Sequence, residues 1–431
     1  MTRVLLPNLF FEEELQSIAI PTSPKARQLV AEIGPTMGLL AGETPGKSTP
    51  PDARSLRSIV VVAEDARPDD LPAALQGVEF LTMNELAARV ALEPQSDSDQ
   101  SKDWEAVPWG WSHSAAAIFK RAGLRSRAPD INVVRSINSR QFQSTFDAAI
   151  EIDGTQRVDA FGTLCRSPPE VTAAIQAACE YSPRGWVIKA DLSHASRNRL
   201  LGSSTDLRSE HRAWLETRFA SGECVYVEPW MERISECGLQ FFVPSAESPT
   251  ATIEFIGAAE MLTDAAGRYR GSIVRSAPQD AIWQPAIDHC LQIAKTAASK
   301  GYFGPLGIDC MVFRCPKHKS RWLRLSHDIN GRLTMGRVAL SLRRFLEAGE
   351  TGFWVHDATD SILRNEKTSD RGFSGGVRIV QTSPGRIGGK AARMGTAFVV
   401  SADSDVLRAV CTGIPGQSFR TTRNLGSERH S

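Results

Sequence analysis

GPLGIDCMVFRCPKHKSRWLRLSHDINGRLTMG, residues 304–336, predicts two β-strands joined by a polar turn near Pro316–Lys319. Asp309 and Asp328 each interrupt an otherwise apolar run. Asp328 and Asn330 are two residues apart, so their side chains leave the same face of an extended strand. The hairpin places Asp309 opposite or diagonal to that pair. Two carboxylates and one amide oxygen are hard ligands that suit a magnesium ion bridging nucleotide phosphates.

The alternative for this segment is an exposed hairpin whose acids face water, since edge strands tolerate Asp. The combination of Asp309 with the Asp-x-Asn-x-Arg pattern ending at Arg332 favours the ion site. The guanidinium of Arg332 is a planar cation suited to phosphate or carboxylate. Cys310 and Cys315 flank the predicted turn, and a cross-strand disulfide between them is the less favoured alternative to free thiols.

Composition limits the class of protein. The 431 residues are 42% hydrophobic and 23% charged, with a formal net charge of +1. These values are typical of a soluble globular protein of several domains. The balanced charge gives no reason to expect binding to bulk nucleic acid or to a membrane surface. The N-terminal apolar patch lacks the features of a signal peptide, and the eight scattered cysteines favour free thiols in the cytoplasm.

The chain divides by pattern into three regions: 1–112, 113–345 and 346–431. The first contains the β-branched run SIVVVA and then VEFLTMNELAARVAL (78–92), an alternation that predicts a parallel α/β sheet. The segment 93–105 is polar and acidic and is the best linker candidate. The region after 345 is predicted to be an extension with a polar tail after Ser418. Helices are predicted over 113–123, 167–182 and 285–301 from their caps and apolar spacing.

A strand that ends on a lysine is the next candidate for chemistry. GWVIKADLSHASRNRLLG (185–202) ends its apolar strand on Lys189, whose buried ammonium requires an anion. The small, polar loop that follows would let backbone N–H groups approach phosphate oxygens. A lysine that extends from the strand end to solvent is the equal alternative. Upstream, Arg140 lies at a predicted helix start, where a surface arginine and a phosphate contact are both compatible with the pattern.

A strand that breaks at Glu-Pro resembles a base-binding hinge. In GECVYVEPWMERISECGLQFFV (222–243), the strand VYV is interrupted by Glu228, Pro229, Trp230 and Met231 and resumes near Gly238. Such a break exposes main-chain groups, and the apolar neighbours could cover a planar base. Glu236 is placed to contact a ribose hydroxyl. A simple β-bend is the alternative.

In this order, the segments resemble the ATP-grasp superfamily over residues from about 115 to 345. The resemblance implies an α/β fold (α+β in the ATP-binding part), in which a Rossmann-like pre-ATP-grasp domain precedes an ATP-grasp domain with a lid over approximately 150–230. By resemblance, Lys189 matches the lid lysine, Glu228 to Met231 the hinge, and Glu236 the ribose acid. The metal ligands are expected at Asp309, Asp328 and Asn330.

The resemblance implies an ATP-dependent ligase of the acid–amino-acid type, which joins a carboxylate to an amine or thiol through an acylphosphate. Its cofactors are expected to be ATP and Mg2+, with Mn2+ as an alternative ion, and its partners small-molecule carboxylate and amine substrates. Arg332 would lie near the transferred phosphate, and Arg275 would hold the acylphosphate or the substrate carboxylate. His327 is assigned a structural role, because strand parity directs it away from Asp328. The rival hypotheses are a phosphotransferase and a non-catalytic ATP-binding module.

Three departures from the superfamily pattern bear on activity. Arg140 stands where many members have a second ATP-binding lysine. The predicted lid loop SHASRNR contains no glycine, which bears on its closure over phosphates. The second metal acid is Asp328 where Glu is usual, and it is one methylene shorter.

Overall fold

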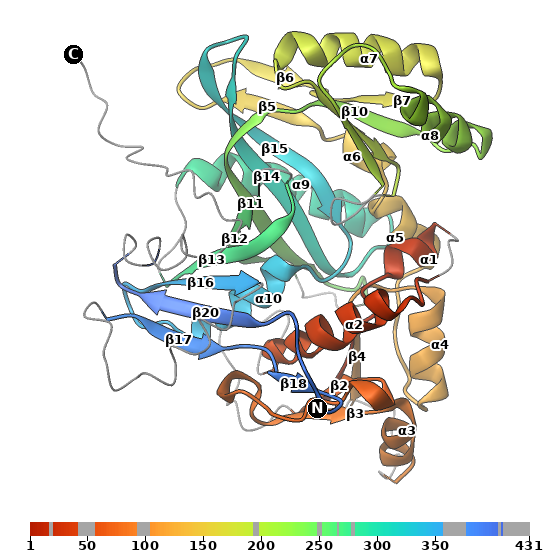
Figure 1. The fold of residues 1–431 in the computed structure, drawn as a ribbon, viewed down its shortest axis with the longest axis vertical. Helices are drawn as coiled ribbons and strands as arrows, with labels where there is room; N and C mark the ends of the chain where they lie inside the picture. The colour runs from red at the N-terminus through yellow and green to blue at the C-terminus, as the bar shows by residue number, and fades with distance from the viewer. Residues whose placement is uncertain are drawn as a thin grey trace.

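The structure is a computed structural model that describes residues 1–16, 20–41, 57–92, 104–192, 198–247, 252–264, 267–276, 281–356, 376–403 and 407. The predictions for 93–103, for the loop residues 193–197 and for the tail after Ser418 concern positions outside these ranges. Three sheets dominate the described part (Figure 1).

The predicted N-terminal parallel sheet is confirmed. Its strands run in the order β3-β2-β1-β4 and all pair in parallel. Their bounds are β1 Thr2–Leu6, β2 Arg57–Val61, β3 Val78–Leu81 and β4 Trp104–Pro108. Because β2 and β4 flank β1 on opposite sides, the carboxyl ends of β1 and β4 form the switch point where open α/β sheets bind ligands. The accompanying helices are α1 Phe11–Leu15, α2 Pro24–Ile33, α3 Met83–Leu92 and α4 His113–Arg121.

The predicted linker requires a correction at its end. Trp104 and Glu105 do not belong to a connecting segment, because they open β4 and pair with Thr2 and Arg3 of β1. Arg3 forms an ion pair with Glu105 at 3.0 Å. The polar composition of 93–105 gave no indication that a strand begins at Trp104. Its charged residue, Glu105, is neutralised by Arg3 on the neighbouring strand.

A ten-stranded sheet forms the centre of the molecule, in the order β17-β20-β16-β13-β12-β11-β14-β15-β5-β6. Its strands are β5 Ala148–Glu151, β6 Arg157–Asp159, β11 Glu232–Val243, β12 Glu254–Thr263, β13 Tyr269–Arg275, β14 Gly304–Cys315, β15 Ser320–Asn330, β16 Thr351–His356, β17 Arg378–Gln381 and β20 Thr396–Ser401. The predicted hairpin is confirmed as β14 and β15, with Cys315 paired to Ser320 across the turn.

Helix α9 (Gln284–Ser299) covers one face of this sheet and contacts β11, β14 and β15. Its buried residues follow the helical period: Ala286, Cys290, Ile293, Ala294 and Ala297. Helix α10 (Met335–Ser341) contacts β11, β12 and β13. The short helices α5 (Ile131–Ile137) and α6 (Arg140–Ser144) lead into β5. The helices predicted over 113–123, 167–182 and 285–301 are therefore confirmed as α4, α7 and α9.

A smaller sheet forms the part drawn at the top of Figure 1, with the order β7-β10-β8-β9. We call it the lid sheet; its strands are β7 Thr163–Cys165, β8 Trp186–Ala190, β9 Arg199–Gly202 and β10 Val225–Pro229. Helix α7 (Pro168–Tyr181) packs on it through Val171, Ala174 and Ile175, and α8 (Ser209–Ala220) adds Leu215. This sheet has a hydrophobic core of its own.

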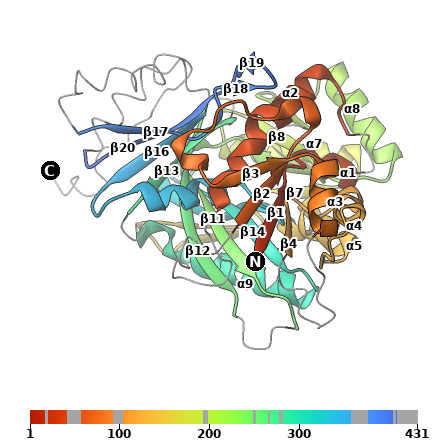
Figure 2. The same ribbon diagram turned by 90° about the horizontal axis from the view of Figure 1, so that it is seen from below.

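The C-terminal strands are joined closely to the rest of the molecule. β16 pairs with β13, so the central sheet continues across the boundary predicted at residue 346. The hairpin of β18 (Arg386–Ile387) and β19 (Lys390–Ala391) lies beside α2 (Figure 2). Near it, the carboxylate of Glu32 in α2 accepts hydrogen bonds from the backbone N–H groups of Arg393 and Met394 at 2.9 and 3.2 Å.

The seven cysteines in the described residues are free thiols, so the alternative of a Cys310–Cys315 disulfide is not realised. The Cys310 thiol donates instead to the carbonyl oxygen of Cys237 at 3.2 Å. No helix within the described ranges has the length and apolarity needed to span a membrane.

His356 predicts a pH dependence of stability. It ends β16 and is 7% exposed, between the rings of Trp354 and Tyr269 at centroid distances of 4.5 and 5.1 Å. Burial, and secondly Arg270, lower the pKa of His356 to about 3. The unfolded chain therefore binds more protons than the folded chain below the unfolded pKa of roughly 6.5, and stability falls as the pH falls through that window.

We expect His356 to contribute a loss of about 1.4 kcal/mol in unfolding free energy between pH 7.5 and pH 5.5. Urea denaturation of the unmodified protein and of His356→Phe at both pH values measures it. The variant should lose less stability over this interval by that amount. An equal loss in both proteins would show that His356 is not held in its neutral form.

Candidate active site

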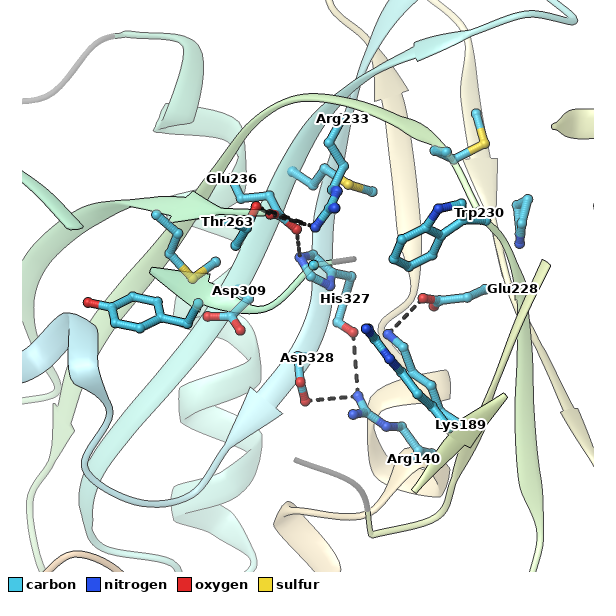
Figure 3. A pocket seen from close by; sticks show the side chains of 17 residues that line it. Arg140, Lys189, Glu228, Trp230, Arg233, Glu236, Thr263, Asp309, His327 and Asp328 are labelled. Carbon is cyan, nitrogen blue, oxygen red and sulfur yellow. Dashed lines mark hydrogen bonds and ion pairs between the residues drawn. The ribbon is translucent and has the colours of Figure 1, made fainter. Parts of the chain in front are cut away.

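A cavity of about 180 Å3 lies between the lid sheet and the central sheet (Figure 3). The lid strands β8, β9 and β10 contribute residues to it, as do β11 to β15 of the central sheet. Nine of the predicted site residues line it: Arg140, Lys189, Glu228, Pro229, Trp230, Met231, Glu236, Asp309 and Asp328. Asn330, Arg332 and Arg275 are not among the lining residues. The volume is below the roughly 300–1,000 Å3 typical of small-molecule pockets.

The two predicted metal acids face each other directly. Asp309 of β14 pairs with Asp328 of β15 in the strand register. Burial, and then the charge of Asp328, raise the pKa of Asp309 to about 8. Burial also acts to raise the pKa of Asp328, but Arg140, at 2.8 Å, and Lys189 outweigh it and hold that pKa below its usual value. Two carboxylates at this spacing favour a cation between them.

The donor set of the hairpin fits a hard cation. Asn330 pairs with Gly307 two residues along the same ladder from the Asp309–Asp328 pair, and it is 8% exposed. The oxygens of these three side chains are of the type that magnesium prefers. Within the described ranges, no group of three or more His, Cys, Asp or Glu residues is arranged to bind a metal. An ion held here would therefore need further ligands, such as phosphate oxygens or water.

Lys189 lies at the end of β8, as predicted, and is paired rather than extended into solvent. Its ammonium is 2.7 Å from a carboxylate oxygen of Glu228, and both side chains are nearly buried, at 11% and 7% exposure. Burial lowers the pKa of Lys189, against the attraction of Glu228. An additional anion at this point would stabilise the charged ammonium.

Arg324 is a buried cation beside the cavity that the strand pattern did not identify. Its side chain is 1% exposed and forms ion pairs with Asp147 at 2.9 Å and with Glu228 at 2.8 Å. The Tyr226 hydroxyl donates to Asp147 in the same cluster. Burial acts to raise the pKa of Glu228, but Arg324 and then Lys189 outweigh it and lower that pKa. The sequence did contain a signal for Arg324. In the alternating strand WLRLS, this arginine occupies a position that faces the interior.

The predicted hinge lies between β10 and β11. Pro229 and Glu228 still pair with β8, and the backbone N–H of Trp230 donates to the carbonyl of Gly185 at 2.8 Å. The indole ring of Trp230 lies under the guanidinium groups of Arg199 and Arg233, at 5.5 and 5.1 Å from its centroid. The hinge thus provides a flat aromatic wall that faces the cavity.

Glu236, the predicted ribose acid, is already engaged. Its carboxylate accepts hydrogen bonds from Arg233 at 3.0 Å and from the Thr263 hydroxyl at 2.7 Å. Arg233 was not predicted, because residues three apart on a regular strand point to opposite faces. A register shift between Arg233 and Ser235 turns both charged side chains toward the cavity.

The structural role assigned to His327 was wrong. His327 lines the cavity, with Nε2 at 3.9 Å from Glu236 (Figure 3). Between the pairs Met311–Arg324 and Asp309–Asp328, β15 advances four residues while β14 advances two. This irregularity breaks the parity on which the assignment rested. Burial, and then Lys189, lower the pKa of His327 to about 4, so its ring is neutral near pH 7.

The prediction that Arg275 contacts the acylphosphate is not supported by its position. Arg275 ends β13 and donates to Glu260 at 2.8 Å. Ile273, two residues before it, pairs with Glu260, whereas the cavity-lining residues of β12 are Met261 and Thr263. Regular strand alternation therefore places Arg275 on the face of Ile273 and Glu260, opposite to that of Met261.

Arg332 lies beyond the hairpin, at the junction with the N-terminal sheet. Its Nε is 2.5 Å from a carboxylate oxygen of Glu12 in α1, and its guanidinium lies 5.8 Å from the ring centroid of Trp109. The charge of Arg332 acts to lower the pKa of Asp309, against the larger effects of burial and of Asp328. Trp109 and Trp111 are buried at this junction.

Comparison with known proteins shows the fold. No protein-family model and no curated protein matches the sequence. Among solved structures, N5-carboxyaminoimidazole synthetase from Staphylococcus aureus complexed with ADP is similar over 96% of this chain and 96% of its own, with a TM-score of 0.51 and 11% identity. The biotin carboxylase–ATP complex from Campylobacter jejuni is similar over 95% of this chain and 89% of its own, with a TM-score of 0.50 and 12% identity.

These similarities extend over nearly the whole chain, including the N-terminal parallel sheet. Both compared structures are ATP-grasp enzymes, so the chain has the ATP-grasp fold. The prediction of an α/β chain with a Rossmann-like domain before an ATP-grasp domain is confirmed. At 11–12% identity the likeness establishes the fold alone.

Proposed function

We propose that this chain is an ATP-dependent ligase that joins a carboxylate to an amine, or to a thiol, through an acylphosphate. The observation that carries the proposal is the facing pair of Asp309 and Asp328 beside Lys189 and Arg140 in one cavity. The two cationic side chains suit the phosphates of a nucleotide, and the two carboxylates suit its metal counter-ion. Strands of two sheets hold these groups together. ADP and ATP complexes of proteins with the same fold support the choice of nucleotide.

The hinge residues supply the adenine end of the site. Trp230 and Met231 present an aromatic ring and a thioether for a planar base. Glu236 is positioned for a ribose hydroxyl once Arg233 and Thr263 release it. Because the cavity of about 180 Å3 is small for a whole nucleotide, we expect Arg233 to move when ATP binds.

Lys189 and Arg140 would bind the phosphates of the nucleotide. Their cations neutralise charge on the γ-phosphoryl group while the substrate carboxylate attacks it and ADP leaves. The amine then attacks the acyl carbon of the acylphosphate and displaces inorganic phosphate. A magnesium ion bound by Asp309, Asp328 and Asn330 would add positive charge to the same group, and manganese suits these oxygens equally. Arg332, near the metal acids, would orient the substrate carboxylate.

An ADP-release screen tests the proposed function. Pools of carboxylic acids and amines are supplied with ATP and magnesium, and active pools are examined for a joined product by mass spectrometry. We expect ADP release to require a carboxylic acid, with the joined product forming only when an amine or thiol is present. A stable phosphorylated product without a joined one would overturn the ligase in favour of a phosphotransferase. ATP binding without turnover in any pool would favour a non-catalytic module.

A further inference from the structure

A second cavity lies beside the N-terminal sheet, where it meets the central sheet. It has a volume of about 450 Å3, within the roughly 300–1,000 Å3 range of pockets for organic ligands. It runs along the edge strand β4 and reaches the ends of β11 and β14, where Phe242 and Pro305 line it. We propose that this cavity, here called the junction pocket, binds the carboxylate substrate, and that this substrate is an aromatic carboxylic acid. The proposal rests on the ligase function proposed above.

The walls of the junction pocket select for a flat apolar body. Six of the lining residues are aromatic: Trp104, Trp109, Trp111, Phe242, Tyr302 and Phe303. Aromatic rings bind aromatic ligands through stacked and edge-to-face contacts and through the burial of apolar area. A small acid such as acetate would leave most of this wall in contact with water.

The charge of the same pocket selects for an anion. Five arginines line it: Arg3, Arg125, Arg127, Arg332 and Arg337. Among the described lining residues, Glu105 is the one acid, and it is paired with Arg3 at 3.0 Å. Arg332 and Arg127 are paired with acids that do not line the pocket, Glu12 and Glu247. Guanidinium groups bind carboxylates through paired hydrogen bonds, so the lining favours an acid over its neutral amide.

Arg332 connects the junction pocket with the metal hairpin. It lines the pocket, and its charge acts on Asp309. The strand register places both sites on one face of the central sheet, because Gly238 pairs with Asp309 and Phe242 pairs with Pro305 four residues further along. That separation is about 13 Å along the strands. A carboxylate held at Arg332 would therefore lie between the pocket and the phosphate end of the nucleotide site.

The side chain between these two sites is polar. Gln240 is 2% exposed and lies on the same face, between Gly238 and Phe242. Its carbonyl oxygen accepts a hydrogen bond from the Thr334 hydroxyl at 2.8 Å. Its amide nitrogen is buried, and no acceptor among the described residues is paired with it. Buried donors are normally paired, so this nitrogen is consistent with a polar ligand group entering the space between the sites.

The test measures binding of phenylacetate, phenylacetamide and acetate by calorimetry, without nucleotide. We expect phenylacetate to bind at least about tenfold more tightly than either of the others, since each lacks the charge or the ring. Ala106→Trp, which fills the pocket from β4, should abolish phenylacetate binding. Ala213→Trp, on the exposed surface of α8, is the matched control and should bind phenylacetate normally.

The outcomes separate this proposal from the ligase proposal. ADP binding is measured in parallel and should be unchanged in Ala106→Trp. If phenylacetate binds as predicted but the unmodified protein binds no ADP, the pocket assignment stands and the ligase fails. If phenylacetate does not bind, or binds no better than phenylacetamide or acetate, the assignment is overturned. If Ala106→Trp does not fold, Trp104→Ala replaces it, with an expected loss of at least about tenfold in phenylacetate affinity.

Discussion

Asp309→Asn is expected to lower the rate of ADP release by about two to three orders of magnitude, the range found when one electrostatic contact to the reacting group is lost. The substitution keeps the shape of the side chain but removes one of the two facing carboxylates of the hairpin. Steady-state ADP release at saturating ATP and magnesium measures the effect. Asp288→Asn, at an exposed position of α9, is the matched control and should leave the rate unchanged.

Folding of the Asp309→Asn variant can be checked independently. Because the pKa of Asp309 is raised to about 8, the folded metal-free protein binds a proton that the unfolded chain releases above a pH of roughly 4. As the pH rises between these values, the unmodified protein should therefore lose stability relative to the variant. A variant that is folded, lacks this pH-dependent loss and is fully active would show that Asp309 does not hold the ion.

Arg324→Met is expected to lower the free energy of unfolding by about 3–5 kcal/mol, because it leaves buried carboxylates without their cation. Asp147 is fully buried and Glu228 is 7% exposed, and both form ion pairs with Arg324. Glu228 would keep Lys189 as a partner, but Asp147 would lose its ion pair. Urea denaturation at pH 7.5 measures the change.

The control for this effect lies on the same strand. Arg321 is 29% exposed and pairs with Asp153, which is 66% exposed, at 2.7 Å. Exposed pairs of this kind contribute at most about 1 kcal/mol, so Arg321→Met should lower stability by no more than that. If Arg324→Met and Arg321→Met lowered the free energy of unfolding equally, the buried ion pairs of Arg324 would contribute no more stability than an exposed pair.

The hairpin shows what sequence patterning can predict. Alternation and a polar turn were sufficient to bring Asp309 close to Asp328. A regular register from the Cys315–Ser320 pair would set Asp309 opposite Ser326, and the two extra residues of β15 move Asp328 into that position. Lys189 was located by the cost of burying an ammonium at the end of an apolar strand. Residue types that are unfavourable for their local pattern thus identified the main groups of the site.

The remaining residues depended on irregular strands. Parity places His327 and Arg233 on faces opposite to those that they occupy, because extra residues in β15 and β11 shift the register. Such bulges arise from tertiary packing against neighbouring strands, and strand periodicity does not contain them.

The contact between Arg332 and Glu12 depended on long-range packing. These residues are far apart in the chain and meet where the hairpin reaches the switch point of the N-terminal sheet. Nothing in the sequence around Glu12 marks it as a partner for the hairpin. The position of the junction pocket follows from the same packing and was equally outside the reach of local patterns.

ADP release by the unmodified protein is the measurement that tests the central claim most directly. ATP is supplied with magnesium, with and without the carboxylic acid found active in the screen, and each reaction is repeated with EDTA. We predict ADP release that requires both the acid and the metal. A protein that binds no ATP, or that releases ADP at the same rate without acid and without metal, would contradict the account.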